Sequence, residues 1–187
     1  DTLPHFRCRH LLATDAWLTE HSAAVPGGVD AVCVKAADIE RMSSLTSPQP
    51  VMAVYEIPED SPLPAEAENH LLVALDRVQD PGNLGTIIRL CDWFGVRHIL
   101  AAYDTADVFS PKVVQATMGA ISRVQVHYCD LAAELSRLGA TMPVYGTFLD
   151  GDNLYRCDLQ RSRGVIVMGN EGRGICPEVE ATVSHRL

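Results

Sequence analysis

The sequence has no apolar run long enough to span a bilayer, and its first residues, DTLPHFRCRH, lack the hydrophobic segment of a secretory signal peptide. These absences argue against a membrane-spanning or secreted protein, so we expect a cytoplasmic protein without a membrane partner. What is present is an apolar share of 47% in 187 residues. This is enough for one large domain or two small ones, each with a packed core.

Metal-binding and disulfide patterns are also missing. The six cysteines are scattered singly without a C-x-x-C pair, and the seven histidines include no H-E-x-x-H. Most of the cysteines fall within apolar segments such as AVCVK and IIRLCDWF. We therefore expect buried, reduced thiols and no metal site.

Positive charge is scarce, with 15 Lys and Arg against 24 Asp and Glu and a net charge of −9. Residues 1–69 hold 4 basic against 11 acidic side chains, and residues 70–187 hold 11 against 13. This balance argues against a simple basic nucleic-acid-binding domain. Thirteen of the fifteen cations are arginine, the side chain suited to bidentate contacts with phosphate and carboxylate.

The first part of the chain alternates between strand-like and helix-like patterns. Strands are predicted at HLLAT, DAVCVK and PVMAVYEI, and helices at DAWLTEHSA, with Asp15 as its N-cap, and AADIERMSSL. This order predicts a small α/β domain over residues 1–57. Residues 58–69 contain three prolines among acidic residues and no apolar periodicity, which predicts a stiff linker.

Residues 70–187 continue the alternation with more strongly apolar strands. Strands are predicted at residues 70–78, 98–103, 123–128, 143–149 and 163–169, and helices at 83–95, 110–122, 130–139 and 176–184. Continuous apolar strands separated by helices predict an α/β domain, a parallel sheet with helices on both faces. In such sheets the ligand lies beyond the carboxyl ends of the strands. The loops expected there are DPGN, LDGDN and GNEGRG.

An arginine stands off the apolar stripe of the first helix in this domain. Asn83 is the expected N-cap, and the stripe consists of Leu84, Ile87, Ile88, Cys91 and Phe94. Arg89 shares a face with Gly85, which leaves the space beside it open. Alternatively, Arg89 is an exposed residue paired with Asp92, and Gly85 permits close packing on the sheet.

The segment MGNEGRGICPE places a glycine-rich turn between a strand and a helix, where backbone N–H groups can bind an anionic or polar ligand. Its glycines, Gly169, Gly172 and Gly174, have the spacing G-x-x-G-x-G, which fits neither a P-loop nor the dinucleotide fingerprint. Taken alone, the segment favours a tight turn capped by Asn170 or Glu171 over a ligand-binding loop.

Taken together, the segments resemble the TrmH (SpoU) branch of the SPOUT RNA methyltransferases. DPGNLGTIIRLCDWFGV resembles that family's first motif, and SPKVVQATMGAISRV resembles the segment that follows it. VYGTFLDG and VIVMGNEGRGICPEV resemble the strand end and the second motif, which bind S-adenosyl-L-methionine. The resemblance covers residues 70–187. Residues 10–57 resemble the end of the small α/β substrate-binding (RNA-binding) domain that many members carry in front, so we expect residues 1–57 to be an incomplete domain of this kind.

The resemblance implies a SPOUT-type trefoil-knot domain, a homodimer and S-adenosyl-L-methionine as cofactor. It also implies methylation of the 2′-hydroxyl of a ribose in rRNA or tRNA. The family's third motif is expected after Leu187, so we expect the sequence to be part of a longer protein. Two other functions stay open: a non-catalytic RNA- or ribosome-binding module with the same fold, and a domain that binds another nucleotide through GNEGRG.

The resemblance assigns catalytic roles to Arg89, Asn83 and Glu171. Arg89 is implied to be the base that activates the ribose hydroxyl. Because a guanidinium stays protonated, we favour stabilisation of the developing alkoxide or binding of the adjacent phosphate. Glu171 is expected to orient Arg89 or Asn83. The positions implied to contact the cofactor are Thr147, Leu149, Gly169, Asn170, Glu171 and Ile175. Methyl transfer from a sulfonium needs no metal.

RNA binding is expected at Arg89 and at three further arginines that lie close together in sequence: Arg156, Arg161 and Arg163. If they flank the site, a dimer doubles a local positive strip on an acidic protein. The alternative is a set of scattered, solvated arginines.

Overall fold

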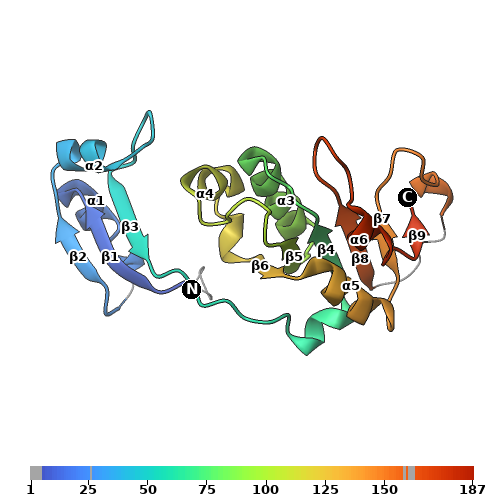
Figure 1. Cartoon of the computed structure of the whole chain (residues 1–187). Coiled ribbons are helices and arrows are strands. Elements are labelled where there is room, and N and C mark those ends of the chain that lie inside the picture. The colour runs from blue at the N-terminus through green and yellow to red at the C-terminus, as the bar shows by residue number, and fades with distance from the viewer. Residues whose placement is uncertain (1–5, 26, 158, 160–162) are drawn as a thin grey trace. The chain divides into compact units, whose positions relative to one another are not determined.

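The computed structural model describes residues 6–25, 27–157, 159 and 163–187. The chain divides into two compact units, one ending at Glu59 and the other running from Asp60 to Leu187 (Figure 1).

The described residues of the first unit form a mixed sheet in the order β2-β1-β3. Its strands are β1 (Cys8–Ala13), β2 (Asp30–Cys33) and β3 (Val51–Tyr55), and its α-helices are α1 (Asp15–Glu20) and α2 (Ala36–Met42). Strand β1 pairs in parallel with β2 and antiparallel with β3. The predicted small α/β unit is therefore present.

Helix α1 is capped by Thr14 and not, as predicted, by Asp15. The Thr14 hydroxyl accepts a hydrogen bond from the Trp17 backbone N–H at 3.4 Å, and Asp15 lies inside the first turn. Both residues suit a helix start, because a hydroxyl caps the free N–H groups and a carboxylate in the first turn complements the helix dipole.

The described part of the second unit forms one parallel sheet of six strands, in the order β6-β5-β4-β8-β7-β9. The strands are β4 (Leu71–Leu75), β5 (His98–Ala102), β6 (Gln125–Cys129), β7 (Val144–Gly146), β8 (Gly164–Met168) and β9 (His185–Arg186). The α-helices are α3 (Pro81–Trp93), α4 (Pro111–Thr117), α5 (Leu131–Gly139) and α6 (Pro177–Glu180). The predicted parallel sheet is confirmed. Strand β9, which pairs with β7, was not predicted.

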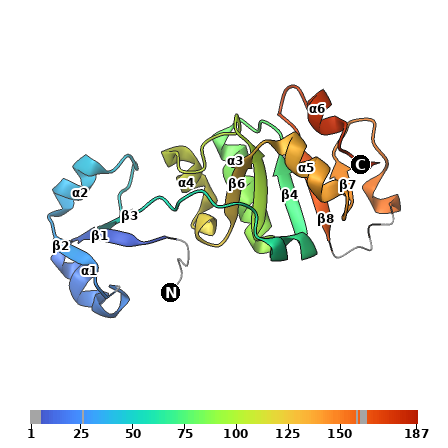
Figure 2. The same ribbon diagram turned by 60° about the horizontal axis from the view of Figure 1, so that its bottom comes forward.

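Helices cover both faces of this sheet, as predicted. Along β4, Leu72 and Ala74 belong to the core that contains α5, whereas Val73 and Leu75 belong to the core that contains α3. Successive strand residues point to opposite faces, so burial of both sets requires a layer on each side. Figure 2 shows α5 on one side of the sheet and α3 on the other.

Part of the predicted linker packs against the second unit. Residues Ala65–Asn69 form a short 3₁₀ helix, and Ala67 is fully buried in the α5 core. Glu68 forms an ion pair with Arg137 of α5 at 2.6 Å. The end of the predicted linker is therefore fixed to the domain that follows it.

All six cysteines are free, but only Cys91 is buried, and Cys33 is exposed. The expectation of buried thiols is therefore wrong for five of the six. Among the described residues, no helix has the length and apolar character needed to cross a membrane. No group of three or more His, Cys, Asp or Glu side chains in that part of the chain is arranged to hold a metal ion.

Candidate active site

Three loops follow the adjacent strands β4, β8 and β7 of the parallel sheet. Because parallel strands end on the same edge, these loops share the carboxyl edge, where ligands of doubly wound sheets bind. The loop after β4 and the loop after β8 are in direct hydrogen-bonding contact, as the following residues show.

Helix α3 begins at Pro81, two residues earlier than predicted. Its N-cap is Asp80, whose side chain accepts a hydrogen bond from the Asn83 backbone N–H at 2.8 Å. Proline suits the first helical position because its missing N–H would have no partner there. Asn83 is therefore not the cap. Its side chain points instead to the glycine-rich loop, where it donates to the Glu171 carboxylate at 3.1 Å.

Glu171 joins the two loops. Its carboxylate accepts hydrogen bonds from the Asn83 side chain and from the backbone N–H groups of Asp80, at 3.2 Å, and Gln79, at 3.4 Å. Partial burial opposes ionisation, but these hydrogen bonds outweigh it and lower the pKa of Glu171. The expected hydrogen bond between Glu171 and Asn83 is present, and Glu171 and Arg89, both among the described residues, form no hydrogen bond or ion pair with each other.

Asn170 holds the glycine-rich loop in shape. Its side-chain oxygen accepts hydrogen bonds from the backbone N–H groups of Gly172 and Arg173, and its amide donates to the Arg77 carbonyl at 2.7 Å. A side chain at Gly169 has no room, because a Cβ there would lie 2.3 Å from the carbonyl carbon of Gly174. The loop is therefore a closed turn attached to the end of β4.

Asp76, at the end of β4, was not singled out in the sequence although its side chain is only 2% exposed. It accepts a hydrogen bond from the Cys176 backbone N–H at 2.5 Å and forms an ion pair with Arg77 at 3.0 Å. Arg77 has a φ of 59°, a left-handed conformation that is uncommon for a residue with a side chain. The available signal was a carboxylate directly after a strongly apolar strand.

Arg89 is exposed on α3, and it makes no hydrogen bond or ion pair with any described residue. The alternative pairing with Asp92 is wrong, because Asp92 binds Arg123 at 2.8 Å and Arg97 at 3.3 Å.

The predicted open space beside Gly85 is filled: a Cβ on Gly85 would lie 2.4 Å from the Cβ of Ala116 in α4. Phe94, predicted to be buried, is 75% exposed at the helix end.

The residues expected to contact the cofactor differ in their hydrogen bonding and burial. The backbone N–H and hydroxyl of Thr147 both donate to the Val167 carbonyl, at 3.1 and 3.0 Å, which ties the end of β7 to β8. Leu149 is fully exposed in the loop that follows, whereas Ile175 is only 8% exposed and packs in the α5 core. Any contact of Ile175 with a ligand would therefore involve mainly its backbone.

Of the three arginines that lie close together in sequence, the structure describes two, Arg156 and Arg163. Arg156 ends a short 3₁₀ helix between β7 and β8, and Arg163 immediately precedes β8. Arg163 therefore lies at the amino end of β8, on the edge of the sheet opposite to the contacting loops. Arg161 lies outside the described residues.

The fold is that of a doubly wound α/β protein, and its candidate ligand site is built from loops at the carboxyl edge of a parallel sheet. Residues 70–187 match the model of the SpoU rRNA Methylase family. The chain belongs to this family.

Other proteins resemble this chain both in sequence and in three-dimensional structure. The chain is 35% identical over 130 residues to the 23S rRNA (guanosine(2553)-2′-O)-methyltransferase RlmP of Bacillus subtilis, with 69% of this chain and 51% of the relative covered. A TrmH-family protein from Porphyromonas gingivalis is 44% identical, with a TM-score of 0.88 over 100% of this chain and 74% of the other. An AdoMet-bound rRNA methyltransferase from Sinorhizobium meliloti is 30% identical, with a TM-score of 0.82 over 97% and 70%. The chain thus spans about half the length of the Bacillus relative.

Proposed function

We propose that this protein is an S-adenosyl-L-methionine-dependent methyltransferase that modifies the 2′-hydroxyl of a ribose in ribosomal or transfer RNA. The observation that carries the proposal is the hydrogen-bonded contact between Asn83 and Glu171. It joins the two loops at the edge of the sheet where a ligand is expected, and Arg89, on the same helix as Asn83, has no hydrogen-bond or ion-pair partner among the described residues. The names of the Bacillus and Sinorhizobium relatives support both the reaction and the cofactor.

The residues present fit such a cofactor. The apolar side chain of Leu149, two residues after Thr147 in the chain, is fully exposed, and an adenine ring is bound by apolar side chains of this kind. The glycine-rich loop is closed by two reciprocal backbone hydrogen bonds between Asn170 and Gly174, which hold it against the end of β8 at the edge of the sheet where a ligand is expected. We assign cofactor binding to Thr147, Leu149, Gly169, Asn170, Glu171 and Ile175.

The cofactor, when bound, supplies a methyl group on a sulfonium, and the ribose oxygen displaces that sulfur in line. The protein must align the two reactants and stabilise the oxygen as its proton leaves. Arg89 suits this task because its guanidinium stays protonated and has no other partner among the described residues. Asn83 and Glu171 hold the start of α3 in place, and this fixes the direction from which Arg89 projects.

We further propose a homodimer with Arg89 near its interface. Three large apolar side chains close to Arg89 on α3 are exposed: Leu90, Trp93 and Phe94. Contiguous exposed apolar surface of this kind marks interaction sites, and a second copy would place Arg89 beside the partner's surface. Light scattering at micromolar concentration tests this, and an active monomer would contradict it. The trefoil knot and an RNA-binding role for residues 1–57, Arg156, Arg161 and Arg163 stay predictions.

Calorimetric titration with S-adenosyl-L-methionine tests the proposed function. We expect saturable binding that is weakened in Leu149→Ser and unchanged in Leu154→Ser, an exposed leucine of the same connection outside the assigned positions. Absence of binding at ~1 mM ligand, which corresponds to less than about 4 kcal/mol of binding free energy, would remove the proposal. It would leave a non-catalytic RNA-binding module with the same fold.

A further inference from the structure

The loop after β7 closes around the end of β9. The Leu187 backbone N–H donates to the Gly146 carbonyl at 2.8 Å, and the Phe148 N–H donates to the Leu187 carbonyl at 2.7 Å. The Asp152 N–H donates to the Arg186 carbonyl at 3.1 Å. Because successive carbonyls of a strand point in opposite directions, the loop contacts β9 from both sides. A Cβ on Gly151 would lie 2.1 Å from the Leu187 carbonyl oxygen, so only glycine fits there.

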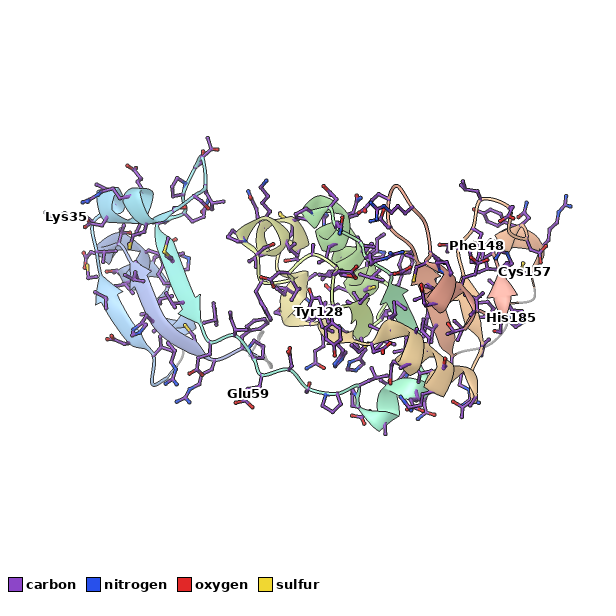
Figure 3. All side chains as sticks on the ribbon, viewed as in Figure 1. Lys35, Glu59, Tyr128, Phe148, Cys157 and His185 are labelled. Carbon is purple, nitrogen blue, oxygen red and sulfur yellow. The ribbon has the colours of Figure 1, made fainter. Side chains whose placement is uncertain are left out.

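The side chain of Arg186 fastens this arrangement. Its guanidinium carbon lies 3.6 Å from the centre of the Phe148 ring, and the same group forms ion pairs with Asp150 at 3.0 Å and with Glu180 of α6. Figure 3 shows Phe148 and His185, the residue before Arg186, at this end of the sheet. One guanidinium thus joins the loop after β7, strand β9 and helix α6.

We expect the contacts of Arg186 to restrict the conformation of the loop more than they raise the free energy of unfolding. The side chains of Arg186 and Asp150 are 43% and 80% exposed, and exposed ion pairs contribute little to the free energy of unfolding. A planar guanidinium stacked on an aromatic ring, however, restricts both groups to one orientation. Phe148 stands between Thr147 and Leu149 in the chain, so a fixed Phe148 ring limits the backbone conformations that this segment can adopt.

We propose that Arg186 is a positioning residue, which holds the loop after β7 in the shape that cofactor binding requires. The inference rests on the proposed function, because Thr147 and Leu149 are assigned to the cofactor only there. It adds a residue outside those assigned positions that acts on the site without touching the ligand.

The test compares Arg186→Gln with Arg137→Gln. Arg137 is a matched control because it is 50% exposed and also pairs with two carboxylates, Glu68 and Glu134, away from the loop. Amide hydrogen exchange at Phe148 and Asp152 should be faster in Arg186→Gln only. The dissociation constant for S-adenosyl-L-methionine should rise about tenfold in that variant, which corresponds to about 1.4 kcal/mol of binding free energy. Arg137→Gln should change neither quantity.

A conservative variant separates positioning from loss of charge. Arg186→Lys keeps the positive charge beside Asp150 and Glu180 but lacks the planar group stacked on Phe148, so exchange at Phe148 and Asp152 should stay faster than in the unmodified protein. Unchanged exchange and affinity in Arg186→Gln would overturn the proposal. If exchange is faster in Arg186→Gln but the unmodified protein binds no S-adenosyl-L-methionine, Arg186 does restrain the loop after β7, and it is the proposed function that fails.

Discussion

Among the arginines around helix α3, Arg89 differs from its neighbours in the described structure. Arg97 and Arg123 both bind Asp92, and the hydrogen bond from Arg123 is the main cause of the lowered pKa of that carboxyl. Arg89 has no partner among the described residues. A guanidinium without a partner is available for a phosphate or a developing alkoxide, whereas the two paired ones serve to fasten the end of the helix.

Replacement of Arg89 tests this distinction. Arg89→Ala should lower single-turnover methylation by about 10²–10³, the usual loss for one preorganised donor, with little change in cofactor affinity. Arg89→Lys should restore little, because an ammonium lacks the planar two-pronged geometry. Asp92→Ala is the control: it should keep a near-normal rate while losing up to about 1 kcal/mol of stability through release of Arg97 and Arg123. Normal rates in both variants would make Arg89 a surface residue only.

The pH dependence of stability tests the role of Glu171. Its folded pKa lies below the ordinary value of 4.5, so its contribution is complete above that value and is lost as the pH falls through the lowered pKa. Glu171→Gln should therefore be less stable than the unmodified protein at pH 7, and the difference should disappear in acid. Urea unfolding across this range measures it. Glu66→Gln, an exposed glutamate outside the loop contacts, should show no such change.

At the scale of secondary structure elements, the packing of α3 on α4 depends on a glycine. A Cβ on Gly85 would lie 2.4 Å from the Ala116 Cβ and 3.0 Å from its carbonyl carbon, both far inside normal contact distance. The same helix supplies Asn83 and Arg89. Close approach of the two helices therefore helps to set the position from which the candidate catalytic side chains project.

Gly85→Ala should lower the free energy of unfolding by about 1–3 kcal/mol through overpacking, although alanine favours a helix over glycine by about 1 kcal/mol. Gly139→Ala in α5 is the matched control, because a Cβ there meets only Val144 at 3.7 Å, and it should be neutral or stabilising. Chemical denaturation of both variants measures these changes in the free energy of unfolding. Equal effects would contradict the packing argument, and adding Ala116→Gly should rescue Gly85→Ala in part.

The sequence predicted the long elements better than their ends. Strong apolar strands and periodic helices specify the central sheet on their own, whereas β9 has two residues and exists because β7 offers it a pairing edge. The start of α3 was misjudged because Asp80 and Asn83 are both good caps, and only the position of Glu171 separates them. The contact between Asn83 and Glu171 could be anticipated from the family motifs. The roles of Asp76 and Arg186 depend on residues distant in sequence, and no local pattern reveals them.

At the scale of the whole molecule, the boundary between the two compact units falls at Asp60. The residues after it are fastened to the second unit, since the Ser61 carbonyl lies 2.8 Å from a ring nitrogen of His127 and Glu68 pairs with Arg137. Glu59, which precedes this anchored segment, is exposed. We therefore expect the most mobile backbone of the connection just before Asp60, although the predicted linker extends to residue 69.

Limited proteolysis with a glutamate-specific protease tests this. Within residues 56–69 the first cut should follow Glu59, because Glu56 pairs with Arg9 and the glutamates of residues 65–69 belong to a packed 3₁₀ helix. Mass spectrometry of the early fragments identifies the bond. Equally early cleavage after Glu66 or Glu68 would show that the whole predicted linker is mobile.

The central claim is that the loops at the carboxyl edge of the sheet support methylation of a ribose hydroxyl in RNA. The most direct measurement is incubation of unmodified rRNA and tRNA transcripts with the protein and isotope-labelled S-adenosyl-L-methionine, followed by alkaline hydrolysis and mass spectrometry. Alkali cleaves RNA through the free 2′-hydroxyl, so a methyl group on that oxygen leaves an uncleaved dinucleotide. We predict labelled dinucleotides with the unmodified protein and strongly reduced amounts with Arg89→Ala. Label found only on bases, or equal labelling by both proteins, would contradict the account.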